Sequence, residues 1–119
     1  MSMRVKLATR VADLIKRELA GLLLRRIKDP RLNGVTIAGV ELTEDLRHAR
    51  VFFSLLGDND KRKQAEEGLE SARGFVRHEI GQALRIKYIP EIEFKYDSSF
   101  EYAEHIETLF QQIKHHELD

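Results

Sequence analysis

Apolar and polar residues alternate with a helical period near the N-terminus of the chain. From Thr9 to Ile27 the apolar residues recur at i, i+3 and i+4 and form one stripe, which predicts an amphipathic helix. Pro30 ends this helix, because a proline disfavours helical conformation in the residue before it. The stripe consists of Val11, Leu14, Ile15, Leu19, Leu22 and Leu23, and Lys6, Arg10, Asp13 and Arg17 fall near the opposite side.

Three later stretches have the pattern of strands. Residues 35–42 and 48–55 are separated by a short polar connection, so we expect the two strands to pair antiparallel. Residues 91–97 alternate cleanly between apolar and polar positions, which is typical of a half-buried strand. The apolar positions are Ala49, Val51, Phe53 and Leu55 in the second strand, and Ile92, Phe94 and Tyr96 in the third.

Helical periodicity returns on either side of the third strand. Residues 60–72 and 74–86 are predicted to form two helical segments that meet near Gly74, with Asp58 or Asp60 as the N-cap of the first. After the third strand, Ser98 and Glu101 have the spacing of a capping box. A last helix is therefore predicted, and its apolar side carries Phe100, Ala103, Ile106, Leu109, Phe110 and Ile113.

The order of predicted elements is α-β-β-α-α-β-α. A three-stranded sheet needs one covered face to be stable, and the apolar helix stripes can cover it. The sequence therefore predicts a two-layer α+β domain. We assign residues 1–113 to this single domain and residues 114–119 to a frayed C-terminal tail.

Composition narrows the class of protein. The chain has 119 residues, 42% hydrophobic and 34% charged, which suits one globular domain with one core. It has no Cys, which excludes disulfides and thiolate chemistry and is compatible with a cytoplasmic location. Charges interrupt every apolar run near the N-terminus, so no signal peptide is expected, and no stretch approaches the ~20 apolar residues of a membrane span.

The net charge of zero conceals a gradient along the chain. Residues 1–31 carry a net charge of +6, residues 32–90 are balanced, and residues 91–119 carry −6. Such asymmetry favours a basic pole for an anionic partner and an acidic end that faces elsewhere. The alternative is a solvated surface on which charges cluster by chance.

Three glycines in the predicted middle helices raise a question, because a glycine inside a helix costs roughly 1 kcal/mol relative to alanine. On a helical wheel, Gly74 and Gly81 fall together with Arg77, His78 and Arg85, whereas Gly68 lies apart. A break at Gly74 would start a new helix, whose free N–H groups could bind phosphate. The alternative is that the glycines only let helices pack closely, and the sequence leaves both interpretations open.

The order of elements, with a glycine corner between the middle helices, resembles the type II KH domain. The GxxG loop of that fold is absent, and Ala72-Arg73-Gly74 stands at the corner. This feature resembles the ribosome-binding factor A family, in which an Ala-x-Gly helix kink replaces the loop. Further similarity lies in "IKDPRL" (27–32), "HARVFFSLLGD" (48–58), "IPEIEFKYDSS" (89–99) and "EYAEHIETLF" (101–110).

The resemblance implies a non-enzymatic factor of ribosome assembly. Members of the family bind the free small (30S) ribosomal subunit and its 16S rRNA, assist late rRNA maturation and matter most in the cold. For this chain we therefore expect no cofactor, no metal, no membrane and no small-molecule substrate. The sequence shows no obvious apolar surface stripe, so we also expect a monomer. The alternative is a protein–protein adaptor of the same fold that makes no direct RNA contact.

Candidate RNA contacts follow from the basic residues near the glycine corner and on the first helix. The predicted RNA-binding residues are Lys6, Arg10, Arg17, Arg73, Gly74, Arg77, His78, Arg85 and Lys87. The strand aromatics and Phe75 are expected to be largely buried, so we expect recognition of backbone and shape more than of bases. In "DPRL" we expect Asp29 to end the first helix and Arg31 to pair with a carboxylate, although this loop could instead contact RNA.

Other kinds of site have little support in the sequence. No phosphate-binding GxxxxGK[ST] motif and no nucleophile on a strand-to-helix elbow is present, so no enzyme is predicted. Glu101 and His105 have helical i, i+4 spacing, which could suit a metal ion, but a solvated acidic helix is the preferred interpretation.

Overall fold

The computed structural model describes residues 2–99 and confirms the α+β class. Its elements are α1 (Met3–Arg25), the short 3₁₀ helix η1 (Pro30–Leu32), β1 (Thr36–Leu42), β2 (His48–Ser54), α2 (Asn59–Leu84) and β3 (Glu91–Tyr96). The sheet has the order β1-β2-β3; β1 pairs antiparallel with β2, and β3 pairs parallel with β2. The predicted last helix, the tail from 114 and the domain boundary at 113 lie outside the described residues.

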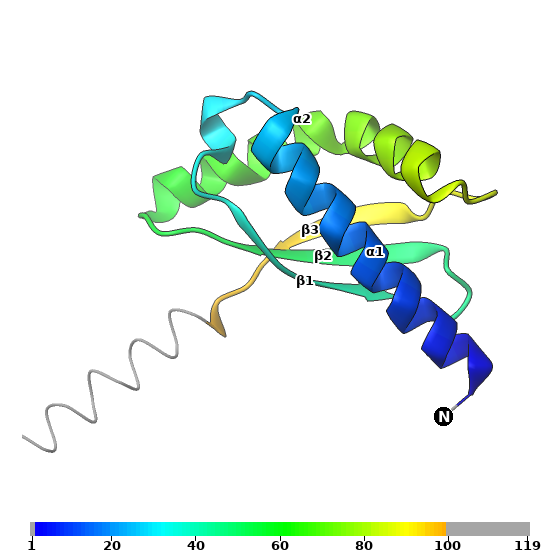
Figure 1. The fold of residues 1–119 in the computed structure, drawn as a ribbon. Coiled ribbons are helices and arrows are strands. Elements are labelled where there is room, and N and C mark those ends of the chain that lie inside the picture. The colour runs from blue at the N-terminus through cyan, green and yellow to red at the C-terminus, as the bar shows by residue number, and fades with distance from the viewer. Residues whose placement is uncertain (1, 100–119) are drawn as a thin grey trace, which may run out of the picture.

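Both long helices lie on the same face of the sheet, as Figure 1 shows. The alternation of the strands directs one set of side chains toward these helices, where Val51 and Phe53 of β2 are fully buried. They meet Ile15 and Leu19 of α1 in one core cluster, to which α2 contributes Leu69, Val76 and Ile80. The opposite face of the sheet has no cover within the described residues, so the domain has two layers.

Helix α1 begins before the predicted start at Thr9. The Ser2 hydroxyl accepts a hydrogen bond from the Val5 N–H at 3.3 Å and caps the helix. The small residues Ala8 and Ala12 are buried in this first half, whereas Leu14, predicted in the core stripe, is 40% exposed. The prediction was wrong at Leu14 because the buried residues of α1, which include Ile15, Leu19 and Leu22, centre on a different side of the helical turn.

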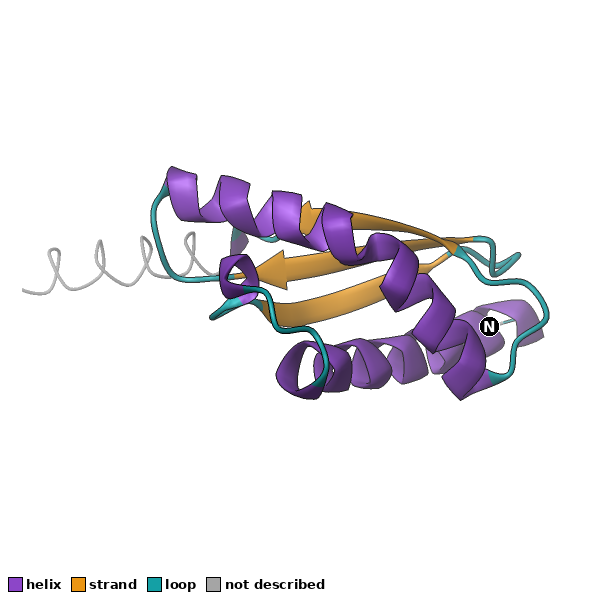
Figure 2. Ribbon diagram, turned by 90° about the horizontal axis from the view of Figure 1, so that it is seen from above, coloured by secondary structure: helices purple, strands orange, loops and turns teal. Residues whose placement is uncertain are grey.

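Helix α2 is continuous, so the predicted break at Gly74 is wrong. Every residue from Asn59 to Leu84 is helical, and Asp58 caps the N-terminus by accepting a hydrogen bond from the Lys61 N–H at 2.9 Å. The two halves of α2 nevertheless run in different directions in Figure 2, so the helix bends without losing its hydrogen-bonded pattern. No second helix N-terminus, and therefore no set of free N–H groups, exists at Gly74.

The three glycines of α2 turn out to have different surroundings. A Cβ on Gly68 would lie 2.9 Å from Leu32 Cδ2, and one on Gly81 would lie 2.6 Å from Ile89 Cδ1. Gly68 and Gly81 therefore let neighbouring segments approach the helix closely, which agrees with the packing interpretation that the sequence left open. A Cβ on Gly74 would meet nothing within 4 Å, and Gly74 is exposed.

The "DPRL" segment has a structural role, and Arg31 pairs with a carboxylate as predicted. The prediction that Asp29 ends the first helix was wrong, because α1 already ends at Arg25 and Asp29 instead caps the 3₁₀ helix η1. Asp29 accepts hydrogen bonds from the Arg31 N–H at 3.0 Å and from Arg31 Nη2 at 2.7 Å. These bonds hold the pKa of Asp29 below its ordinary value of 3.8. The resulting turn places Leu32, which is buried, against Gly68 of α2.

Replacement of Asp29 by Asn is expected to change the pH dependence of stability. A carboxyl whose pKa is lower in the folded state stabilises the fold above its unfolded pKa, and this contribution disappears as the pH falls through the folded pKa. The wild type should therefore resist urea better than Asp29→Asn at pH 6, and the difference should shrink below pH 3.8. A difference that stays constant down to pH 2.5 would contradict this role.

Substitution of the two contrasting glycines of α2 by alanine is expected to have opposite effects. Gly74→Ala should raise the free energy of unfolding by roughly 0.5–1 kcal/mol, because alanine favours the helix and its Cβ meets no neighbour. Gly68→Ala should lower it by roughly 1 kcal/mol, because the Cβ crowds Leu32 and the Arg31 Cβ. Urea denaturation measures both. Equal stabilisation by the two substitutions would show that Gly68 is not a packing contact.

Candidate nucleic-acid interface

Helix α1 as a whole carries an excess of positive charge. The helix contains six basic and two acidic residues, which gives it a net charge of +4. The basic residues are Arg4, Lys6, Arg10, Lys16, Arg17 and Arg25, and the acidic residues are Asp13 and Glu18. None of these residues takes part in an ion pair within residues 2–99. The charges of α1 are therefore uncompensated by the rest of the described chain.

Three predicted RNA-binding residues come together on this side of α1. Lys6, Arg10 and Arg17 line one shallow hollow along the helix, together with Thr9, Asp13 and Leu14. They share a side because the residues that α1 buries against the sheet occupy the opposite positions of the helical turn. The helical wheel predicted this grouping correctly.

The predicted basic residues of α2 do not form one cluster. Arg77 donates hydrogen bonds from Nε to the Pro90 carbonyl at 3.1 Å and from Nη2 to the Ile89 carbonyl at 3.2 Å. Its Nη2 also lies 3.4 Å from the Glu91 carboxylate. Arg77 is therefore used to hold the α2–β3 connection against α2. Arg73 forms an ion pair with Glu70 at 3.6 Å on the exposed side.

Gly74 and His78 are exposed one helical turn apart on α2. Gly74 follows Ala72 and Arg73 within the continuous helix α2, so the predicted kink sequence lies in unbroken helix. A side-chain-free position lets another backbone approach closely. A contact between RNA and Arg73, Gly74, Arg77 or His78 stays a prediction.

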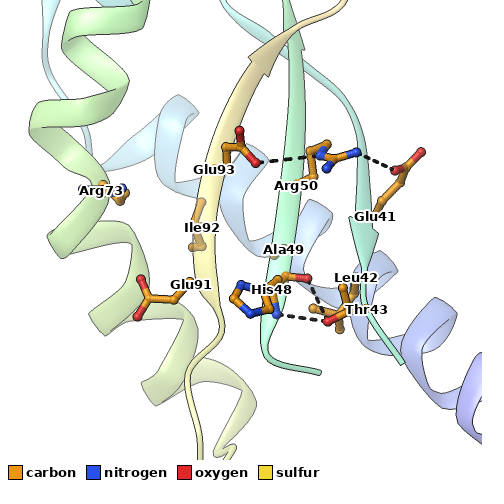
Figure 3. Close-up of a pocket in the computed structure, with 10 residues that line it drawn as sticks. All are labelled: Glu41, Leu42, Thr43, His48, Ala49, Arg50, Arg73, Glu91, Ile92 and Glu93. Carbon is orange, nitrogen blue, oxygen red and sulfur yellow. Dashed lines mark hydrogen bonds and ion pairs between the residues drawn. The ribbon is translucent and has the colours of Figure 1, made fainter. Parts of the chain in front are cut away.

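On the uncovered face of the sheet, basic side chains lie close to acidic ones, so this face does not favour the binding of phosphate. Figure 3 shows Arg50 of β2 between two carboxylates, Glu41 of β1 and Glu93 of β3. The distances are 4.0 Å to Glu41 and 3.8 Å to Glu93, and Lys95 lies 3.6 Å from Glu93. Arg73 of α2 borders a hollow that Glu41, Arg50 and Glu93 also line. Since the cations of this face already meet carboxylates, the outer side of α1 is the better site for an anion.

A third hollow, which we call the Tyr88 hollow, lies where α1, the β1–β2 turn and the α2–β3 connection meet. Lys87, a predicted contact, borders it together with Arg47 and Tyr88, and Arg85 ends α2 two residues earlier. Tyr88 is 69% exposed, although no pattern in the sequence singled it out. Phe75 was expected to be buried, but it is 39% exposed. The Arg26 guanidinium carbon lies 5.6 Å from the centre of the Phe75 ring.

The described residues hold no arrangement typical of acid–base or metal chemistry. No charged or polar side chain is buried among them, and no group of three His, Asp or Glu residues could hold a metal ion. Lowered pKa values occur at Asp29, Asp45 and Asp97, each because the carboxylate accepts hydrogen bonds within its own turn. Glu101 and His105 lie outside the described residues. No helix in residues 2–99 is long and apolar enough to cross a membrane.

Comparison with known proteins shows the family. The chain matches the family model described as Ribosome-binding factor A over residues 8–110. Ribosome-binding factor A of Syntrophobacter fumaroxidans is 49% identical over 117 residues, which cover 97% of this chain and 100% of that protein.

Solved structures of the same family resemble the fold. The crystal structure of ribosome-binding factor A from Thermus thermophilus matches with a TM-score of 0.66 and 22% identity, covering 75% of this chain and 94% of that one. A homology model of the Thermus thermophilus factor, fitted into a cryo-electron microscopy map of its 30S complex, matches with a TM-score of 0.65 and 22% identity, covering 76% of this chain and 96% of that one.

Loss of the Arg77 guanidinium is expected to destabilise the fold. Arg77→Met should lower the free energy of unfolding by about 2 kcal/mol, because the carbonyls of Ile89 and Pro90 lose charge-assisted hydrogen bonds. Arg73→Met is the matched control and should change it by less than about 0.5 kcal/mol, because its ion pair is exposed. Urea denaturation compares the two. Equal small effects would show that Arg77 is free for an external ligand.

Proposed function

The chain belongs to the ribosome-binding factor A family, and on that premise we propose that it is an assembly factor that binds the free small (30S) ribosomal subunit through its 16S rRNA. The uncompensated cations on the outer side of α1 carry this proposal. The Thermus thermophilus family member, fitted into a map of its 30S complex, supports it. We further propose that the factor assists late rRNA maturation and matters most at low temperature.

Counterion release supplies the affinity in this proposal. Phosphate groups that meet Lys6, Arg10 and Arg17 release condensed cations from the rRNA, and this gain in entropy favours binding without reading any sequence. Because these three side chains have no partner carboxylate in residues 2–99, no internal ion pair has to break before they bind. Arg73, Gly74, His78, Arg85 and Lys87 are proposed as further contacts.

Release of the factor requires a difference in affinity between immature and mature subunits. A protein shifts an equilibrium only by its differential affinity for the two states. We propose that the chain holds one conformation of an rRNA segment and leaves when maturation moves or buries that segment. In this proposal the chain catalyses no reaction and needs no cofactor. We also propose that it acts as a monomer in the cytoplasm.

The alternative is an adaptor that binds a ribosomal protein and makes no RNA contact. One observation favours it: α1 exposes Leu7 (51%), Leu14 (40%) and Leu24 (83%) between its cations. Exposed apolar side chains of this kind contribute to protein–protein contacts. The adaptor would keep its binding when the cations of α1 are removed.

Sucrose-gradient sedimentation with free small subunits and with whole ribosomes tests the proposal. The wild type is expected to co-sediment with free small subunits. A variant that carries Lys6→Glu, Arg10→Glu and Arg17→Glu is expected to lose at least tenfold in affinity, since three attractive phosphate contacts become repulsive. These positions are exposed, so circular dichroism should show an unchanged fold.

A variant with the same change of charge at other exposed positions is the control. Lys28→Glu, Lys61→Glu and Lys63→Glu together alter three exposed cations away from the outer side of α1 and should leave binding near the wild-type level. Unchanged sedimentation of the α1 variant would contradict the RNA proposal and favour the adaptor. Equal loss in both variants would show that only total charge matters.

A further inference from the structure

The Tyr88 hollow has the size and the apolar walls of a small-ligand site. Its volume is about 400 Å³, within the ~300–1,000 Å³ typical of such sites. The walls are apolar side chains from three separate parts of the chain: Val11, Leu42, Leu46, Ile86 and Pro90. An unpartnered apolar hollow of this kind fits a flat, largely apolar group.

The rim of the hollow is aromatic and basic. Tyr88 is 69% exposed, so most of its surface is open to a ligand, although the Lys87 ammonium lies over one face of its ring. The Lys87 ammonium lies 5.4 Å from the centre of that ring, and Arg47 borders the hollow from the β1–β2 turn. An aromatic ring beside two cations is complementary to a nucleotide within an RNA chain. The ring can stack on the base, and the cations can bind the flanking phosphates.

Backbone conformation supports a role for this end of the molecule. Leu46 has φ 64° and Arg85 has φ 52°, and they are the only non-glycine residues with positive φ among residues 2–99. Leu46 lines the hollow, and Arg85 precedes the lining residue Ile86. A left-handed conformation costs such side chains of order 1 kcal/mol, so it persists where the surrounding structure holds it, often at functional sites.

The one carboxylate of the lining is compatible with a base. Asp45 Oδ1 accepts hydrogen bonds from the Thr43 hydroxyl at 2.6 Å and from the Arg47 N–H at 3.0 Å. Both hydrogen bonds end on Oδ1, so the second carboxylate oxygen, Oδ2, accepts none of these bonds and can accept a hydrogen bond from a ligand. Amino groups of bases donate to such a carboxylate oxygen.

We propose that the Tyr88 hollow receives one unstacked base of single-stranded RNA, with Tyr88 as the stacking ring. The inference rests on the proposed function, because the base belongs to the rRNA that α1 binds through phosphate. It adds base contact to an interface for which the sequence predicted mainly backbone recognition. An apolar side chain of a ribosomal protein is the competing occupant.

Ultraviolet crosslinking of the full chain to free small subunits, followed by mass spectrometry of its peptides, tests the proposal. Zero-length crosslinking should add a nucleotide to Tyr88. In binding measurements with the same subunits, Tyr88→Ala should weaken affinity about tenfold, because stacking on one base is lost. Tyr88→Phe should stay within about twofold of the wild type, since its ring is retained.

The control is Leu56→Ala, which removes a side chain that is equally exposed, at 71%, beyond the far end of β2. It should bind like the wild type. If Tyr88→Ala binds as tightly as the wild type, or if position 88 crosslinks to a protein and no nucleotide adduct forms, the base site is wrong while the proposed function stands. If the wild type itself does not bind free subunits, the proposed function fails, and the base site with it.

Discussion

The parallel pairing of β2 with β3 is the constraint on which the rest of the structure depends. Parallel neighbours need a crossover that returns the chain to the starting end of the sheet, and α2 provides it. Arg77 secures the return by binding the carbonyls of Ile89 and Pro90 just before β3. Because Glu91 pairs with His48, the end of α2 and the β1–β2 turn lie at the same end of the sheet. The Tyr88 hollow is a direct result of this topology.

A second consequence is the one-sided burial of α1. The helix buries Ile15, Leu19 and Leu22 against the sheet and leaves its other side without a neighbour in the described chain. Since no carboxylate in residues 2–99 forms an ion pair with the cations of α1, they keep their charge for an external partner. The fold and the proposed RNA contact therefore depend on the same orientation of α1.

Much of this fold could be predicted from periodicity, because strands with one buried face and helices with one apolar stripe leave clear patterns. Ala49, Val51 and Phe53 were placed correctly in the core, and Lys6, Arg10 and Arg17 were grouped correctly on one side of α1. The surroundings of Gly68 and Gly81 could not be predicted from the sequence. Gly68 meets Leu32, which is far away along the chain, and Gly81 meets Ile89 across the turn that follows α2. The role of Arg77 and the exposure of Tyr88 were missed for the same reason: a single sequence does not show which carbonyls or surfaces lie nearby.

The salt dependence of binding to free small subunits tests the central claim, that uncompensated cations of α1 bind phosphate. If about five phosphates are neutralised, the logarithm of the binding constant should fall with the logarithm of salt concentration with a slope of about −3 to −4. The measurement spans about 50 to 200 mM salt, where this term dominates. A slope near zero would contradict the account, because it would mean that binding releases no counterions.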